Sequence, residues 1–94
     1  MPTKVVVSAQ VRDYQHSLAP EPRRRLKQAI QGLSNGRGDI KALTDNLSGL
    51  SRLRVGQHRV IYRYHEGRIE CFYAAPRATV YEFLSSHIRE FLGQ

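Results

Sequence analysis

The sequence predicts a small single-domain α+β protein, and three observations lead to this fold class. The chain has 94 residues, which fits one compact domain with one hydrophobic core. Its patterns follow the order strand, two helices, three strands, helix. The three later strands are separated by two-residue turns, which is typical of an antiparallel meander. Since no linker or repeat divides the chain, we expect residues 1–94 to form one domain.

The beginning of the chain predicts a strand and a short helix. The run Thr3–Val7 contains three consecutive valines, a β-branched pattern that is typical of a buried strand. Ser8 follows at a position where a hydroxyl can cap the first turn of a helix. The helix then has its apolar residues on one face, namely Val11, Tyr14 and Leu18.

A second helix is predicted after residues 19–22, where two prolines end the first helix and fit the first turn of the next. Its apolar residues recur at helical spacing, namely Leu26, Ala29, Ile30 and Leu33. Asn35-Gly36 is a typical helix end, so the two helices should form an antiparallel hairpin. The run Arg23-Arg24-Arg25 opposes the dipole at the helix start. It fits a contact to RNA or to an acidic partner, or a solvated surface.

Three strands are predicted in the second half, after a polar segment. Residues 36–45 contain glycine and few apolar residues, and we expect a loop. Leucines within and after it should anchor this loop to the core, namely Leu43, Leu47 and Leu50. The strands are expected over Leu50–Val55, His58–His65 and Arg68–Ala75. The intervening pairs Gly56-Gln57 and Glu66-Gly67 fit two-residue hairpin turns.

These turns determine the register, and the register determines which side chains share a face. Arg54 is then opposite Arg59, and Ile61 is opposite Phe72. The expected core face holds Leu53, Val55, Val60, Tyr62, Tyr64, Ile69, Cys71 and Tyr73. The other face holds Arg52, Arg54, Arg59, Arg63, Glu70 and Phe72. Like charges opposite one another destabilise a sheet, so the paired arginines indicate a binding function. The alternative is that they face water, with Glu70 neutralising Arg63.

The segment Thr79–Leu92 returns to helical spacing and predicts a final helix. Its apolar side consists of Val80, Phe83, Leu84, His87, Ile88 and Phe91. Tyr81 lies off this side, beside the end of the last strand, and the pattern gives it no packing role. A phenol at this position is therefore a candidate functional group.

Composition limits the classes of function. Fifteen Lys and Arg residues against eight Asp and Glu give a formal net charge of +7, and twelve of the fifteen are arginine. Arginine suits recognition of phosphate or carboxylate, so nucleic acid or an acidic protein is the expected partner. The chain has no apolar run of the roughly 18–20 residues that a membrane span needs and no signal-peptide stretch, so we expect a cytoplasmic protein. With one cysteine, Cys71, and no histidines at ligand spacing, we expect no metal or other cofactor.

Two motifs resemble the RelE/ParE superfamily of type II toxins. The run Leu53–Tyr62 (L-R-V-G-Q-H-R-V-I-Y) is similar to the central hairpin of that superfamily, usually L-R-V-G-x-Y-R-V-I-Y, and Pro76–Tyr81 resembles its H-R-x-x-V-Y ending. The order of elements agrees over nearly the whole chain. The resemblance implies a RelE-like microbial RNase fold, with helices on one side of a mostly antiparallel sheet and a concave basic face. It also implies a toxin that a cognate, RelB-like antitoxin neutralises.

Within the superfamily, the resemblance favours a RelE-like mRNA endonuclease, which acts in the ribosomal A site without a metal and uses the 2′-hydroxyl of its substrate as nucleophile. Arg59, Arg77 and Tyr81 match the arginines and the terminal tyrosine of RelE-like enzymes. They are the expected catalytic residues, because arginines can stabilise the phosphorane and a phenol can take a proton or stack on a base. The residues expected to bind RNA are Arg52, Arg54 and Arg63.

The chain also departs from the RelE pattern. Arg52 stands where many active enzymes have lysine, Pro76 stands where a basic residue usually precedes Arg77, and His58 replaces a tyrosine. We expect His58 to be a packed, hydrogen-bonded residue that points toward the core. Two alternatives therefore stay open: a ParE-like toxin that inhibits DNA gyrase, and a catalytically weak homologue that acts as an antitoxin-binding protein.

Overall fold

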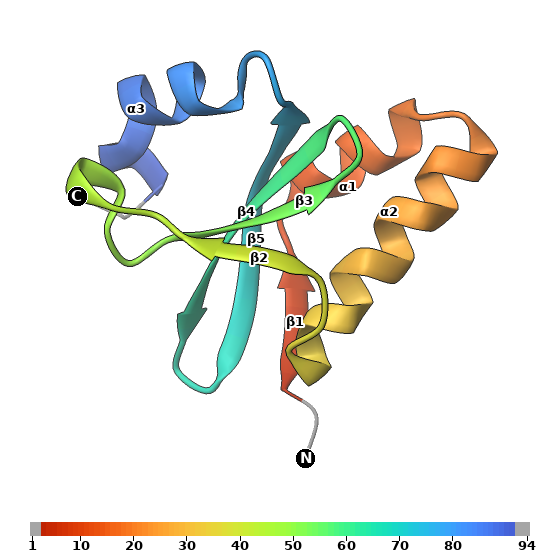
Figure 1. The fold of residues 1–94 in the computed structure, drawn as a ribbon, viewed down its shortest axis with the longest axis horizontal. Helices are drawn as coiled ribbons and strands as arrows, with labels where there is room; N and C mark the ends of the chain where they lie inside the picture. The colour runs from red at the N-terminus through yellow and green to blue at the C-terminus, as the bar shows by residue number, and fades with distance from the viewer. Residues whose placement is uncertain (1–2, 92–94) are drawn as a thin grey trace.

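The computed structural model describes the backbone of residues 3–91 and the side chains of residues 3–84 and 86. This part of the chain forms a five-stranded sheet with the strand order β1-β5-β4-β3-β2, and helices lie on both of its faces (Figure 1). The predicted α+β fold class is confirmed. Among the described helices, none has the length and apolar character that crossing a membrane requires.

The first strand and the two-helix hairpin form as predicted. Strand β1 (Lys4–Val7) pairs in parallel with β5 (Arg68–Pro76), and helices α1 (Ala9–Ser17) and α2 (Pro20–Gly32) follow it. Ser8 caps α1, because its hydroxyl oxygen accepts a hydrogen bond from the backbone N–H of Val11 at 3.2 Å. The same hydroxyl donates to the carbonyl oxygen of Phe72 at 3.0 Å, so the cap also fastens α1 to β5.

Residues 39–42 form a strand that the sequence does not predict. Strand β2 (Asp39–Ala42) pairs antiparallel with β3 (Ser51–Val55) at the edge of the sheet, so the expectation of a continuous loop over residues 36–45 is wrong. All four residues of β2 are exposed, and their polar–apolar alternation (D-I-K-A) covers only four positions, which is a weak strand signal. The leucine anchors are confirmed, because Leu50 is buried and Leu43 and Leu47 pack beside it.

The central meander follows the predicted register up to a β-bulge. The pairing of β3 with β4 (His58–His65) places Arg54 opposite Arg59, as predicted. Between β4 and β5 the register shifts at Ile61, which pairs with Tyr73 and not with Phe72. The shift moves Tyr73 to the face opposite the one predicted. Tyr64, also expected in the core, is 66% exposed near the end of the hairpin.

Each face of the sheet carries its own apolar cluster. The first, against α1 and α2, contains Val11, Leu26, Ile30, Leu33, Leu53, Val55, Val60, Tyr62, Ile69, Cys71 and Ala74. The second, against α3 (Val80–Phe91), contains Leu50, Ile61, Tyr73, Ala75, Val80 and Leu84. Helix α3 therefore covers the other face of the sheet, and the implied placement of all helices on one side is wrong (Figure 1).

The buried side of α3 agrees with the predicted spacing where its side chains are described. Val80 and Leu84 are fully buried, and Phe83 stacks on Tyr73 with ring centroids 4.5 Å apart. Three side chains that the pattern also assigns to this side lie outside the described part, namely His87, Ile88 and Phe91, as does residue Leu92.

Candidate active site

Four elements and the turn after β5 contribute polar side chains to one open hollow beside α3. The hollow has a volume of about 320 Å³ and is lined by Lys41 (β2), Leu43, Arg52 (β3), Arg59 (β4), Arg77 (after β5) and Tyr81 (α3). Four of these six residues are cationic, and no carboxylate lines the hollow within the described residues. The structure thus brings together four of the six residues that the sequence predicts for the site. Such a surface suits an anionic ligand.

Arg59 is the most deeply placed of the four cations. Only 5% of its surface is exposed, and its Nη1 donates to the carbonyl oxygens of Gly56 at 2.8 Å and of His58 at 3.0 Å. These bonds hold one edge of the guanidinium against the β3–β4 turn. Burial lowers the pKa of Arg59, and the positive charge of Arg54 on the adjacent strand lowers it further. A bound phosphate would offset this concentration of positive charge.

Arg52 presents a donor that the protein does not use. Its side chain is 13% exposed, and its Nη2 lies 3.4 Å from Asp39 Oδ1. Its Nε is buried and has no hydrogen-bond partner among the described residues. A buried unpaired donor costs free energy, so the fold holds Arg52 at the hollow at some expense of stability. Arg54 is exposed, and its Nε lies 3.9 Å from Asp39 Oδ2. Its side chain is not part of the lining of the hollow.

Arg77 and Tyr81 reach the hollow because the chain turns directly after β5. The backbone N–H of Arg77 donates to the carbonyl oxygen of Gln57 at 2.8 Å, which ties the end of β5 to the β3–β4 turn. Tyr81 is half-buried in the first turn of α3 and packs against the second apolar cluster. The prediction that Tyr81 has no packing role is therefore wrong, although its side chain does line the hollow.

Two of the singled-out polar residues lie outside the hollow. Arg63 donates through Nε to Glu70 Oε1 at 2.9 Å, and this bond is the main cause that lowers the pKa of Glu70. This ion pair agrees with the alternative interpretation, in which Glu70 neutralises Arg63, and Arg63, expected to bind RNA, does not line the hollow. His58 Nδ1 is 2.7 Å from the hydroxyl of Tyr14 on α1, so the expectation of a packed, hydrogen-bonded histidine is also confirmed.

Lys41 is the lining residue that the sequence analysis missed. It lies on β2, a short strand that buries no apolar face, and it pairs directly with Arg52 of β3. Only the strand pairing shows that its ammonium group belongs to the site. The site therefore contains a lysine, although the position usually occupied by lysine in RelE-like enzymes is Arg52.

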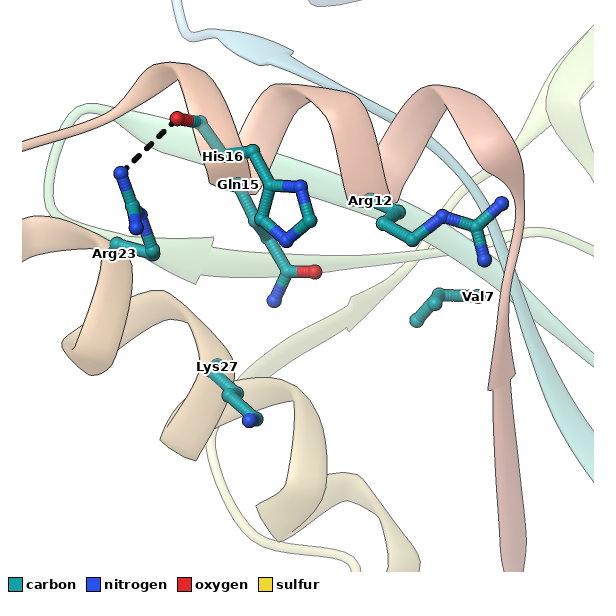
Figure 2. Close-up of a pocket in the computed structure, with 6 residues that line it drawn as sticks. All are labelled: Val7, Arg12, Gln15, His16, Arg23 and Lys27. Atoms are coloured by element: carbon teal, nitrogen blue, oxygen red, sulfur yellow. Dashed lines mark hydrogen bonds between the residues drawn. The ribbon is translucent and has the colours of Figure 1, made fainter.

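A second hollow, of about 300 Å³, lies between α1 and α2, away from α3 (Figure 2). Its lining consists of Val7, Arg12, Gln15, His16, Arg23 and Lys27. Arg23 donates through Nη2 to the carbonyl oxygens of His16 at 3.1 Å and Leu18 at 2.9 Å, where the end of α1 favours positive charge. Arg24 forms an ion pair with Glu21. Two members of the run Arg23-Arg24-Arg25 thus have partners within the chain.

The chemistry of the first hollow depends on cations and a phenol. Among the described residues, no three His, Cys, Asp or Glu side chains are grouped so that they could hold a metal ion. Arginine and lysine side chains can bind and stabilise a phosphate without a metal. The donor set therefore fits chemistry at a phosphodiester.

Comparisons with known proteins find similarity in structure. No family model and no curated protein sequence matches the chain. The toxin–antitoxin complex RelBE2 of Mycobacterium tuberculosis contains a chain with a TM-score of 0.71 and 24% identity, over 82% of this chain and 100% of that one. The RelE–RelB complex of Pyrococcus horikoshii gives a TM-score of 0.65 and 26% identity, over 82% and 97%. YafQ of Escherichia coli gives a TM-score of 0.63 and 14% identity, over 84% of this chain and 98% of that one.

Proposed function

We propose that this chain, which has the fold of the RelE-type toxins, is the toxin of a type II toxin–antitoxin pair. The resemblance predicted from its two motifs is confirmed at the level of the fold. The similar structures from Mycobacterium tuberculosis and Pyrococcus horikoshii are complexes of a toxin with its antitoxin, which supports a RelB-like partner for this chain. Its net charge of +7 supports an acidic partner surface.

The proposed activity is ribosome-dependent, metal-independent cleavage of mRNA in the cytoplasm. One observation carries this proposal: residues that resemble the RelE catalytic set, namely Arg59, Arg77 and Tyr81, surround one hollow together with Arg52 and Lys41. Positioning of a reacting phosphodiester among fixed cations supplies much of what such a reaction requires. The dependence on the ribosome follows the RelE resemblance.

In the proposed reaction, the ribose 2′-oxygen attacks the adjacent phosphorus. A bond forms between the 2′-oxygen and phosphorus, and the bond from phosphorus to the 5′-oxygen of the next nucleotide breaks. The products are a 2′,3′-cyclic phosphate and a 5′-hydroxyl. Arg59 and Arg77 stabilise the negative charge that develops on the phosphorane oxygens. Arg52, a further cation of the lining, adds one more positive charge at the phosphate.

Two proton transfers complete the proposed reaction. The 2′-hydroxyl loses a proton to Tyr81, which accepts it as the phenolate and lines the hollow together with the arginines. The departing 5′-oxygen gains a proton, for which Lys41 is the suited donor, since an ammonium group gives up a proton far more readily than a guanidinium. Tyr81 can instead serve as a platform for base stacking.

Primer extension on cellular mRNA after brief induction of the chain tests the proposed function. We expect cuts in phase with codons, on translated messages only, and none after induction of Arg77→Ala. A message whose start codon is removed serves as the matched control and should stay intact. A loss of DNA supercoiling without mRNA cuts would contradict the proposal and support the gyrase alternative.

A further inference from the structure

The β3–β4 turn holds both arginines that we assign to the phosphate. Three consecutive carbonyl oxygens of this turn are occupied by them. The carbonyl oxygens of Gly56 and His58 accept hydrogen bonds from Nη1 of Arg59, at 2.8 and 3.0 Å. The carbonyl oxygen of Gln57 accepts a hydrogen bond from the backbone N–H of Arg77 at 2.8 Å. The position of the turn therefore determines where the two arginines stand relative to each other.

The turn itself has little packing of its own. Gly56 and Gln57 are exposed, and a hollow of about 260 Å³ separates the turn from the start of α2. This hollow is lined by Pro22, Arg25, Val55, Gly56, Gln57 and His58. Because space remains on this side, contacts with α2 alone do not immobilise the turn.

A hydrogen bond connects the residue that follows the turn, His58, to the helical layer. The hydroxyl of Tyr14, on α1, lies 2.7 Å from Nδ1 of His58, and the two rings meet edge to face with centroids 5.6 Å apart at 76°. Tyr14 in turn packs against the first apolar cluster. The contact thus connects the first apolar cluster to His58, whose carbonyl oxygen accepts a hydrogen bond from Arg59.

We propose that Tyr14 and His58 form a positioning pair that fixes Arg59 and Arg77 in the hollow from the opposite face of the sheet. The pair touches no substrate. Its consequence for cleavage rests on the proposed function, whereas its effect on the two arginines does not. Misplacement of a reacting group by about 1 Å can cost roughly 10²-fold in rate, so a pair that restrains the turn has a large effect on chemistry.

The electrostatic surroundings of His58 suit this role. Burial lowers the pKa of His58, and the cations Arg25 on α2 and Arg59 on β4 lower it further, while Tyr14 is the group that faces it from α1. The imidazole is therefore neutral near pH 7, and Nδ1 can accept the hydrogen of the Tyr14 hydroxyl. A neutral ring also avoids adding one more positive charge beside Arg59.

Amide hydrogen exchange tests the positioning without reference to activity. In Tyr14→Phe we expect the amide of Arg77 to exchange about tenfold faster than in the parent, a factor that corresponds to the loss of roughly one hydrogen bond. The matched control is Tyr62→Phe, which removes another tyrosine hydroxyl of the same apolar cluster, one that is hydrogen-bonded to Ser51. It should leave the Arg77 amide unchanged. Equal exchange of this amide in the parent and Tyr14→Phe would overturn the proposal.

Single-turnover cleavage of ribosome-bound mRNA provides the second measurement. We expect Tyr14→Phe and His58→Ala each to lower the rate at saturating substrate about tenfold or more, with little change in KM. The double variant should be no slower than the slower single one. His58→Asn, which keeps an acceptor near the position of Nδ1, should recover part of the rate. Additive losses would contradict a pair, and absence of cleavage by the parent would contradict only the proposed function.

Discussion

At the scale of single residues, Arg59 combines a structural task with the catalytic task that we propose for it. Its Nη1 is bound to two carbonyl oxygens of the β3–β4 turn, and the rest of the guanidinium lines the hollow. A substitution therefore changes both the turn and the charge at the phosphate. The two effects are separable because stability and cleavage are measured independently.

We expect Arg59→Ala to abolish cleavage and to lower the free energy of unfolding by about 1–3 kcal/mol, since two hydrogen bonds from a charged donor are lost. Urea denaturation and single-turnover cleavage measure the two effects. Arg12→Ala is the matched control, because Arg12 is an exposed arginine at the second hollow and does not line the first. Full toxicity of a normally expressed Arg59→Ala variant would remove Arg59 from the mechanism.

Tyr81→Phe separates the two roles of the phenol. The ring keeps its packing against the second apolar cluster, and only the hydroxyl is removed. If Tyr81 takes the 2′-proton, cleavage should fall by about 10²–10⁴-fold. Retained cleavage in Tyr81→Phe together with loss in Tyr81→Ala would indicate stacking, which is worth about 1–3 kcal/mol per base. Two variants as toxic as the parent would make Tyr81 a bystander and favour the gyrase alternative.

Substitution of Lys41 tests whether the edge strand β2 supplies the proton donor. Lys41→Arg keeps the positive charge but replaces a good proton donor with a poor one, so we expect cleavage to fall about 10²-fold or more while RNA binding is kept. Lys27→Arg, on α2 at the second hollow, is the matched control. Cleavage that persists unchanged in Lys41→Arg would limit the role of Lys41 to electrostatic attraction.

At the scale of elements, the sequence predicts those that bury an apolar face and misses the one that does not. Helix α2 and strand β4 follow from their apolar spacing and their end signals. Strand β2 is exposed along its length, and only its pairing with β3 defines it. The β-bulge at Ile61 could not be predicted either, because the hydrophobic alternation of the two strands does not show where their pairing shifts by one residue. Lys41 and the true face of Tyr73 were missed for these reasons.

The β4–β5 hairpin carries a pH-dependent ion pair. Hydrogen bonds from Arg63 and Arg68 to Glu70 lower the pKa of its carboxyl group in the folded chain. The ion pair therefore stabilises the fold above the unfolded pKa of Glu70, about 4.5, and this contribution is lost as the pH falls through the lower folded value.

We expect Glu70→Gln to be less stable than the parent at pH 7 and the difference to vanish as the pH falls below the lowered pKa of Glu70 in the folded chain. Free energies of unfolding from urea denaturation at a series of pH values measure it. Glu66→Gln, in the exposed turn of the same hairpin, should show a much smaller difference. A difference for Glu70→Gln that is independent of pH would contradict the ion-pair explanation.

At the scale of the whole molecule, a net charge of +7 acts on any acidic partner before contact. We expect an acidic amphipathic antitoxin segment to cover the basic face and exclude RNA. Electrostatic steering should make the association rate fall steeply between low and moderate salt, whereas dissociation changes less. Stopped-flow mixing of the two purified proteins measures both rates. An association rate that barely responds to salt would show that charge does not steer the encounter.

The parallel pairing of β1 with β5 governs when the molecule can assemble during its own synthesis. Lys4–Val7 pair with residues 68–71, and the side chains of Ser8 and Gln10 bond to backbone oxygens 64 residues further along the chain. Helix α1 therefore has no completed sheet to pack on until β5 has emerged from the ribosome, and contacts this distant in sequence form slowly. Arg77 and Tyr81 come later still. The topology of the chain thus delays assembly of the proposed active site in each new copy until translation has passed β5.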